Sequence, residues 1–465
     1  MTKAELLEFL QSQKDEVTAY SQALWDHPET AGQEMASADL SRQMLSKHGF
    51  TIRDVPGMNN AMIAQFGEGA PVIAILGEYD ALPGLSQARC AEKKPLVPGG
   101  PGQGCGHNLL GGAAFGAALA LKEYLVQEGM PGTVRFYGCP EEESLSGKVK
   151  MLKAGVFGDC DVALSWHPLT LNAALKEAFL ANNSVKFRFH GRTAHAAFAP
   201  DKGRSALDAV ELMNVGANYL REHITSDARM HYTITETGGV PNIVPDLAES
   251  WYYIRAPRRQ DVEDISRRLM KVAQGAGLMT ETAVEEEFVC GTYELLPNDV
   301  LFGLTHRNMD EVGLPQYTAE ELAFAEELQR ELSAEAIAAE ASRTAQMTGR
   351  EDRVISQGLF DPDKPVSSLV NGSSEVGDVS WNVPTSLFVT ATWPVGVPPH
   401  TWQATAASGS SIGYKAMLYS ARIMTGIGYD LLNDPALVEE ANRELEERTR
   451  NNPYVNSLDA GIPKE

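Results

Sequence analysis

The sequence has no uninterrupted apolar run that approaches the roughly 20 residues needed to cross a membrane. The uncharged stretch Leu109–Leu121 is too short for that purpose. The N-terminal segment, MTKAELLEFLQSQKDE, predicts an amphipathic helix and not a signal peptide. We therefore expect a protein that has no membrane partner.

Positive charge is also scarce. The chain has 39 Lys and Arg against 62 Asp and Glu, which gives a formal net charge of −23. Because proteins bind nucleic acid through clustered Lys and Arg, we expect no nucleic-acid partner. An anionic small substrate would need a dedicated basic side chain to hold it.

Cysteine is rare as well. The five cysteines are odd in number and follow no repeating spacing, so they predict no disulfide framework and favour a cytoplasmic location. The 43% hydrophobic and 22% charged fractions are typical of a soluble globular protein. At 465 residues the chain is long enough for two domains, since single cores stop growing at roughly 250–300 residues.

Four apolar, strand-like segments end in chemically active side chains. They are PVIAILGEYD with Glu78 and Asp80, TVRFYGCPEEE with Glu141–Glu143, DVALSWHP with His167, and SLFVTATWPVGVPPH with His400. Such continuous apolar strands, separated by helical stretches such as Asn108–Gln127, predict a covered, mainly parallel α/β sheet. Ligands bind outside the carboxyl ends of such strands, so we expect the four ends to converge on one site.

The middle of the chain predicts a different, α+β domain. Its elements are NSVKFRFHG, helix Ala206–His223, HYTITETGG, AESWYYIRA, helix Gln260–Gly275 and ETAVEEEFVCGTY. This β-α-β-β-α-β order is typical of a small open-faced sandwich. We expect it at residues 181–292, inserted between two parts of the catalytic domain, 1–180 and 293–465. Farther on, Glu320–Arg343 is rich in Ala, Glu and Leu and predicts one long solvated helix.

The strand ends and the segment GQGCGHNLLGG together supply five potential metal ligands. They are Cys105, His107, one of Glu141–Glu143, His167 and His400. Thiolate, imidazole and carboxylate all bind divalent metals, and five donors suit two metals that share one ligand. A second glutamate beside the ligating one could act as the general base on metal-bound water.

Each of these motifs also has an ordinary explanation. A lone histidine is more often structural, a run of glutamates is usually a solvated patch, and Cys105 could be a loop residue or a nucleophile. Adjacent glutamates at a buried strand end are less ordinary, because buried like charges need a compensating cation. The convergence of all the motifs favours the metal site, although the pattern leaves open which two adjacent glutamates serve it.

The sequence resembles the aminoacylase/carboxypeptidase-type superfamily of dinuclear metallohydrolases, in its amidohydrolase branch. The resemblance covers nearly the whole chain. It rests on GEYDALPGLSQ, GQGCGHNLLG, CPEEE, WHP, GRTAHAAFAP, GGVPNIVPDLAESWYYIRAP, GSSEVGDVSW and PPHTWQATAASG.

The resemblance implies roles for the residues of the catalytic domain. Cys105 would bridge the two metals, and the other ligands would be His107, Glu143, His167 and His400. Glu142 would be the general base, and Asp80 would support the metal centre. Pro140 aligns with the family motif Pro-Ala-Glu-Glu, so that Glu141 stands at the alanine position.

The inserted domain resembles the family's lid and dimerisation domain. His195 matches a histidine that stabilises the oxyanion in the partner's active site, and Asn242 and Arg255 match residues that hold a substrate carboxylate. We therefore expect a homodimer through the lid, or assembly with a related second subunit.

The function that this resemblance implies is metal-dependent hydrolysis of N-acyl or N-aroyl amino acids. We expect an aromatic-acyl glutamate or aspartate as substrate, with aminobenzoyl-glutamate first, and two divalent ions, Mn²⁺ or Zn²⁺, in each subunit. A dipeptidase or aminoacylase of the same chemistry is the first alternative. A non-catalytic partner subunit that binds ligand is the second.

Overall fold

The structure is a computed structural model that describes residues 1–364 and 372–462. The described residues form two compact units. The first comprises Met1–Glu177, 296–364 and Val379–Tyr454, and the second comprises Ala178–Leu295 together with 372–378 and 455–462. The second unit thus includes two short segments from the C-terminal part of the chain.

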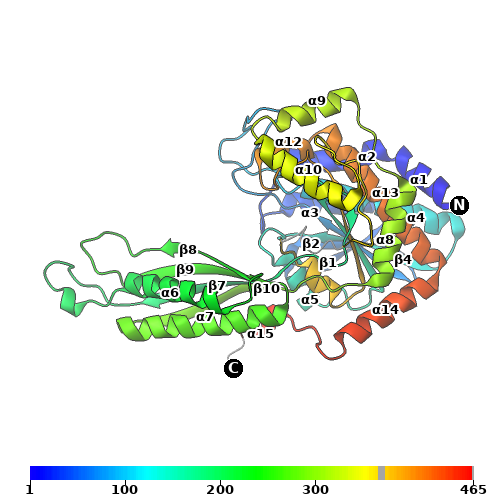
Figure 1. Cartoon of the computed structure of the whole chain (residues 1–465). Helices are drawn as coiled ribbons and strands as arrows, with labels where there is room; N and C mark the ends of the chain where they lie inside the picture. The colour runs from blue at the N-terminus through cyan, green and yellow to red at the C-terminus, as the bar shows by residue number, and fades with distance from the viewer. Residues whose placement is uncertain (365–371, 463–465) are drawn as a thin grey trace. The chain divides into compact units, whose positions relative to one another are not determined.

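The first unit contains a seven-stranded sheet and most of the helices (Figure 1). Its strands are β1 (Thr51–Val55), β2 (Met58–Glu68), β3 (Val72–Glu78), β4 (Gly132–Cys139), β5 (Val162–Leu169), β6 (Ala173–Ala174) and β11 (Thr385–Ala391). Its helices are α1 (Lys3–Ser12), α2 (Lys14–Asp26), α3 (Met35–Lys47), α4 (His107–Glu128), α5 (Gly147–Lys153), α8 (Asp299–Val312), α9 (Ala319–Leu328), α10 (Ala334–Thr348), α12 (Trp402–Ser408), α13 (Ser411–Asn433) and α14 (Pro435–Thr449). Helix α11 (Val376–Ser380) begins in the second unit and ends in the first.

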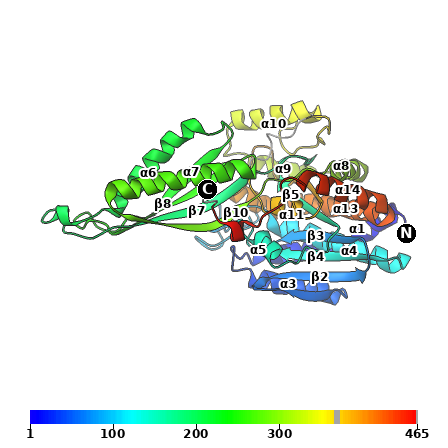
Figure 2. The same cartoon turned by 90° about the horizontal axis from the view of Figure 1, so that it is seen from below.

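The strand order of the large sheet is β1-β2-β4-β3-β5-β11-β6. The central neighbours β4, β3, β5 and β11 are parallel, as the sequence predicts, whereas β1, β2 and β6 pair antiparallel at the edges. The sheet is therefore mixed, and its parallel part consists of the four segments that carry the chemical motifs. Figure 2 shows β2, β4 and β3 side by side in this order.

Burial explains why these strands are continuously apolar. Every residue of β4 and β11 is buried, and because side chains alternate between the two faces of a strand, both faces of the sheet are covered. Helix α4 follows β3 along the chain and packs closely on its end. A Cβ at Gly111 would lie 2.6 Å from the carbonyl oxygen of Glu78, so only glycine permits this approach.

Helix α4 is also the described helix that is long and apolar enough to cross a membrane by length and composition. The short uncharged stretch inside it did not predict this, because the helix extends beyond that stretch at both ends. In the structure 83% of the relevant 18-residue window is buried within the protein. The helix is thus accounted for as a core helix of the first unit.

The single long helix expected over Glu320–Arg343 is wrong. The structure has two helices there, α9 and α10, separated at Gln329–Ser333. The Ser333 side chain accepts a hydrogen bond from the amide of Ala336 and so caps the start of α10. The buried Gln329 donates to the carbonyl oxygens of Arg353 and Val395. Tertiary hydrogen bonds and a local cap thus override the helical composition.

The second unit has the predicted β-α-β-β-α-β order. Its elements are β7 (Ala181–His190), α6 (Ala206–Leu220), β8 (Arg229–Glu236), β9 (Leu247–Ala256), α7 (Arg259–Thr280), β10 (Ala283–Thr292) and α15 (Ser457–Ala460), with short 3₁₀ turns at Pro200–Lys202 and Arg221–His223. The antiparallel sheet has the order β10-β7-β9-β8. Val185, Phe187 and Phe189 alternate along β7 and pack in the core that α6 and α7 complete.

Candidate metal centre

The side chains that the sequence predicts as metal ligands lie together in the first unit. They come from the ends of β3, β4 and β5, from the start of α4, and from the loop after β11. This is the carboxyl edge of the parallel strands, where open α/β sheets bind their ligands. The predicted convergence of the four strand ends is therefore present.

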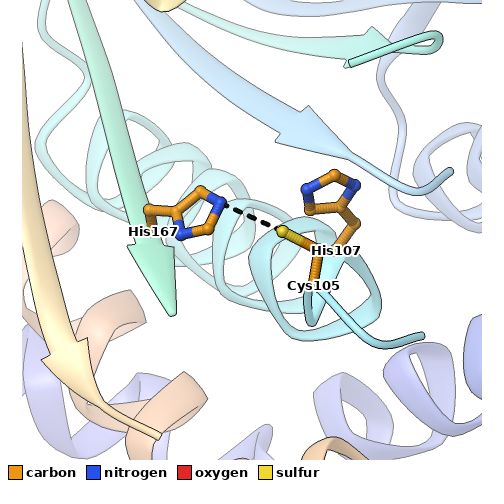
Figure 3. Close-up of side chains that lie close together, drawn as sticks. All are labelled: Cys105, His107 and His167. Carbon is orange, nitrogen blue, oxygen red and sulfur yellow. Dashed lines mark hydrogen bonds between the residues drawn. The ribbon is translucent and has the colours of Figure 1, made fainter. Parts of the chain in front are cut away.

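Gly106 separates the two predicted ligands of GQGCGHNLLGG for a conformational reason. Its φ of 76° is left-handed, and helix α4 begins at the next residue, His107. A Cβ on Gly106 would also lie 3.0 Å from the ring of Pro168. This turn brings Cys105 Sγ to 3.5 Å from His167 Nε2, and Figure 3 shows the sulfur between the two imidazole rings.

Two groups of potential ligand atoms share Cys105. One consists of Cys105, His107 and His167, and the other consists of Cys105, Glu143 and His400. Within each group the ligand atoms lie within 4.8 Å of one another. A thiolate common to two ligand groups is the arrangement expected of a ligand that bridges two metals.

Asp80 orients this cluster. Its Oδ1 lies 2.9 Å from His107 Nδ1, and its Oδ2 accepts a hydrogen bond of 2.8 Å from the backbone amide of Glu143. On the other side of the cluster, His167 Nδ1 lies 2.8 Å from the carbonyl oxygen of Pro168. Such contacts hold Nδ1 and leave the Nε2 atoms of both rings for a metal.

The structure distinguishes the three glutamates that follow β4. Glu142 Oε2 lies 3.7 Å from His107 Nε2, and Glu143 Oε2 lies 3.6 Å from His400 Nε2. Glu141, in contrast, has a left-handed φ of 61° and forms an ion pair with Lys150. Its side chain also accepts hydrogen bonds from Asn60 and Ser146. The adjacent pair beside the histidines is therefore Glu142 and Glu143.

Glu78 is a residue of this cluster for which the sequence predicted no role in the site. It forms a third ligand group with His107 and Glu142. Its Oε1 lies 2.6 Å from Lys148 Nζ, and both side chains are buried. The position of Glu78 two residues before Asp80 was a usable signal, whereas no local pattern marks Lys148.

Burial without a cation strongly perturbs the acid groups of the cluster. Burial raises the pKa of the Cys105 thiol well above its ordinary value and that of Glu143 to about 7. Burial and the neighbouring His107 lower the pKa of His167 to about 4. His107 Nε2 and Glu143 Oε1 are buried and have no hydrogen-bond partner. A thiol, a carboxylate and imidazoles that all lack a partner for their charge or lone pair fit bound divalent cations.

The remaining predicted residues lie in the second unit. The backbones of His195 and Asn242 adjoin, since the amide of Ala196 donates to the carbonyl of Asn242 and His195 bridges to Ile243. Arg255 is not beside them. It pairs with Asn182 near one end of β7, whereas Leu247, the first residue of β9, pairs with His190 at the other end. Eight residues of strand, roughly 26 Å, separate these two ends.

Comparison with known proteins places the chain in a family. Residues 182–278 match the family model described as a peptidase dimerisation domain. The chain is 44% identical to one of the two kinds of subunit, the B chain, of the p-aminobenzoyl-glutamate hydrolase of Escherichia coli, over 96% of this chain and 95% of that protein. It is 27% identical to the Xaa-Arg dipeptidase of Mus musculus over 98% of this chain and 95% of the relative.

A solved structure has the same fold. It is that of a dinuclear metal-binding peptidase of the M20 family from Bacillus subtilis, which is 17% identical to this chain. The TM-score is 0.60, and the match covers 91% of this chain and 99% of the other.

Proposed function

The chain belongs to the M20 peptidase family, and from this membership and its metal centre we propose that it hydrolyses N-aroyl-glutamates, p-aminobenzoyl-glutamate first among them. That it is a metal-dependent hydrolase of amide bonds follows from its relatives. The substrate is inferred from the relative that is 44% identical over nearly the whole chain. The observation that carries the chemistry is that both ligand groups contain Cys105.

The proposed ligands form two sets. Cys105, His107 and His167 would hold one ion, and Cys105, Glu143 and His400 the other. When bound, such ions lower the pKa of water and polarise the substrate carbonyl. The thiolate and imidazoles suit Zn²⁺, while the carboxylates also admit Mn²⁺.

Glu142 is the proposed general base. Its Oε2 lies 3.7 Å from His107 Nε2, at the edge of the ligand cluster, which supports this assignment. The carboxylate takes a proton from the attacking water as oxygen bonds to the amide carbon. It then gives that proton to the amide nitrogen as the C–N bond breaks, so that a neutral amine leaves.

His195 is the proposed donor to the oxyanion. Its Nδ1 accepts hydrogen bonds from the amides of Ala197 and Phe198, at 3.3 and 3.1 Å. Because Nδ1 is an acceptor, the proton of the neutral ring lies on Nε2, which leaves an N–H donor at the outer end of the side chain. A donor of this kind suits a role in the site of a partner subunit.

We also propose that the protein acts as a dimer through the second unit in the cytoplasm. The match to a peptidase dimerisation domain over residues 182–278 supports the dimer, and the five free cysteines fit a reducing compartment. The relative of 44% identity is named as one subunit of a hydrolase, so the partner is either a second copy or a related chain.

The second candidate function is that of a dipeptidase, because a relative that covers 98% of this chain is named a dipeptidase. One experiment separates the two. Purified protein is loaded with Zn²⁺ or Mn²⁺ and assayed against p-aminobenzoyl-glutamate and a panel of dipeptides, including Xaa-Arg. We expect the highest kcat/KM for p-aminobenzoyl-glutamate. Faster hydrolysis of dipeptides would contradict the proposed substrate, and no hydrolysis of any amide would favour a non-catalytic role.

A further inference from the structure

One row of residues crosses the sheet of the second unit from edge to edge. In the register of the strands, Thr292 of β10 lies opposite Asn182 of β7, Asn182 opposite Arg255 of β9, and Arg255 opposite Arg229 of β8. Residues directly opposite in antiparallel strands project from the same face, with Cβ atoms about 4.5–5.5 Å apart. The four side chains therefore form a continuous polar row.

This row lies on the face of the sheet that α6 and α7 do not cover. The next residue of β7, Asn183, points to the helices, because its Nδ2 donates to Ser266 of α7 at 2.9 Å. Successive residues of a strand point to opposite faces, so Asn182 projects away from the helices. The row is thus separate from the hydrogen bonds that join the sheet to α7.

The row contains several buried polar atoms with no partner among the described residues. Asn182 and Thr292 are fully buried, and neither the amide atoms of Asn182 nor Oγ1 of Thr292 form a hydrogen bond. The Nε of Arg255 is unpartnered as well. Most buried polar groups in proteins are hydrogen-bonded, so a cluster of exceptions in one row indicates that something else binds there.

The charge at this end of the sheet indicates what binds. In a chain with a net charge of −23, neither Arg255 nor Arg229 forms an ion pair with any described residue. Burial lowers the pKa of the Arg255 guanidinium, and no nearby carboxylate opposes the shift. His231 adjoins the same region, and after burial the neighbouring Arg255 and Arg229 lower its pKa further. The missing partner of this row is therefore an anion.

We propose that Asn182 and Thr292 join Arg255 in recognising the carboxylate of the amino-acid half of the substrate. An amino-acid fragment carries a carboxylate and an N–H group one carbon apart. The Asn182 amide offers a donor for the first and an acceptor for the second, and the Thr292 hydroxyl and the guanidinium donate to the carboxylate. This inference rests on the proposed function and adds the residues that set its specificity for acidic amino-acid derivatives.

The test uses the metal-loaded full chain and L-glutamate as the probe. Calorimetric titration should show that Asn182→Leu and Thr292→Val each weaken glutamate binding roughly ten- to hundredfold, as expected for loss of a hydrogen bond to a charged group. The KM for p-aminobenzoyl-glutamate should rise in parallel, with kcat little changed. Thr292→Ser retains the hydroxyl and should restore affinity. Thr235→Val removes a hydroxyl at the opposite end of the sheet, bonded to Glu249 at 2.6 Å, and should leave binding unchanged.

Thermal unfolding separates recognition from a structural role. Thr292→Val replaces an unpartnered buried hydroxyl by a methyl group, so Tm without glutamate should stay the same or rise. A lower Tm together with wild-type affinity for glutamate would overturn the inference, as would wild-type affinity in both Asn182→Leu and Thr292→Val. If the wild type binds glutamate through these residues but does not hydrolyse p-aminobenzoyl-glutamate, the proposed function fails and the binding row stands.

Discussion

Asp80 holds His107 in place through a contact of 2.9 Å between Oδ1 and Nδ1, while its other oxygen accepts the backbone amide of Glu143. One buried carboxylate thus orients a ligand from α4 and the turn after β4 that carries another ligand. The two elements are joined without a bond between the ligands themselves.

This relationship predicts a loss of metal affinity in Asp80→Asn. An amide cannot accept from the ring and the backbone in the same way without turning its NH₂ group toward one of them. Loss of such a contact typically lowers metal affinity roughly 10–100-fold. Competition with a chelating dye measures this, and Asp201→Asn, on the surface of the second unit, is the matched control. Equal metal affinity in the two variants would mean that Asp80 does not orient the centre.

The three glutamates after β4 should give three different phenotypes. Glu142→Gln should keep its metals and lose kcat by roughly 10²–10⁴, the typical contribution of a general base. Glu143→Gln should lose metal first. Glu141→Gln should retain both metal and turnover, because Glu141 is bonded to Lys150 away from the histidines. Metal analysis and turnover numbers on the same preparations decide the matter, and a catalytic defect confined to Glu141→Gln would refute the assignment.

The parallel strands were predictable from the sequence because their residues are buried on both faces and therefore apolar throughout. Cys105, His107, His167 and His400 were predictable too, since each follows or ends a recognisable segment. Neither Lys148 beside Glu78 nor the break between α9 and α10 could be predicted. Both depend on contacts with distant parts of the chain, which no local pattern encodes.

Separate placement of Arg255 and Asn242 illustrates the same point. The two residues are close in sequence, and we expected them to act side by side. The register of β9 instead carries Arg255 to the end of the sheet opposite Leu247 and the loop that precedes it. Distance along a strand grows by about 3.3 Å per residue, so residues flanking a long strand cannot meet.

Metal removal should destabilise the protein more at high pH than at low pH. Without metal, burial raises the pKa of Glu143 to about 7 from an ordinary value of 4.5. The protonated form is then favoured by folding, so its stability contribution is present below pH 4.5 and is lost as the pH rises through 7. The loss amounts to about 3 kcal/mol at most. Thermal unfolding of the chelated protein at pH 5 and pH 8 should show the drop, and chelated Glu143→Gln should show a smaller one. The same drop in both would contradict the buried carboxylate as its cause.

Mixed dimers test whether His195 serves a partner's site. His195→Ala and Glu142→Ala should each fold and be nearly inactive, since an oxyanion donor is typically worth roughly 10²–10³ in turnover. If His195 acts across the dimer, a mixed dimer contains one site with both groups intact, and mixing with exchange of chains should restore part of the activity. Persistent inactivity despite demonstrated exchange would show that His195 acts in its own protomer or not at all.

The bridging of two metals by Cys105 is tested most directly by the metal content per chain of the wild type and of Cys105→Ser. Elemental analysis should give two ions per chain in the wild type and a clear loss in Cys105→Ser, with activity falling in step. Alkylation of Cys105 should likewise be slow in the metal-loaded protein and faster after chelation, because a ligated thiolate is not free to react. A Cys105→Ser protein that retains two ions per chain and full turnover would contradict the bridging role.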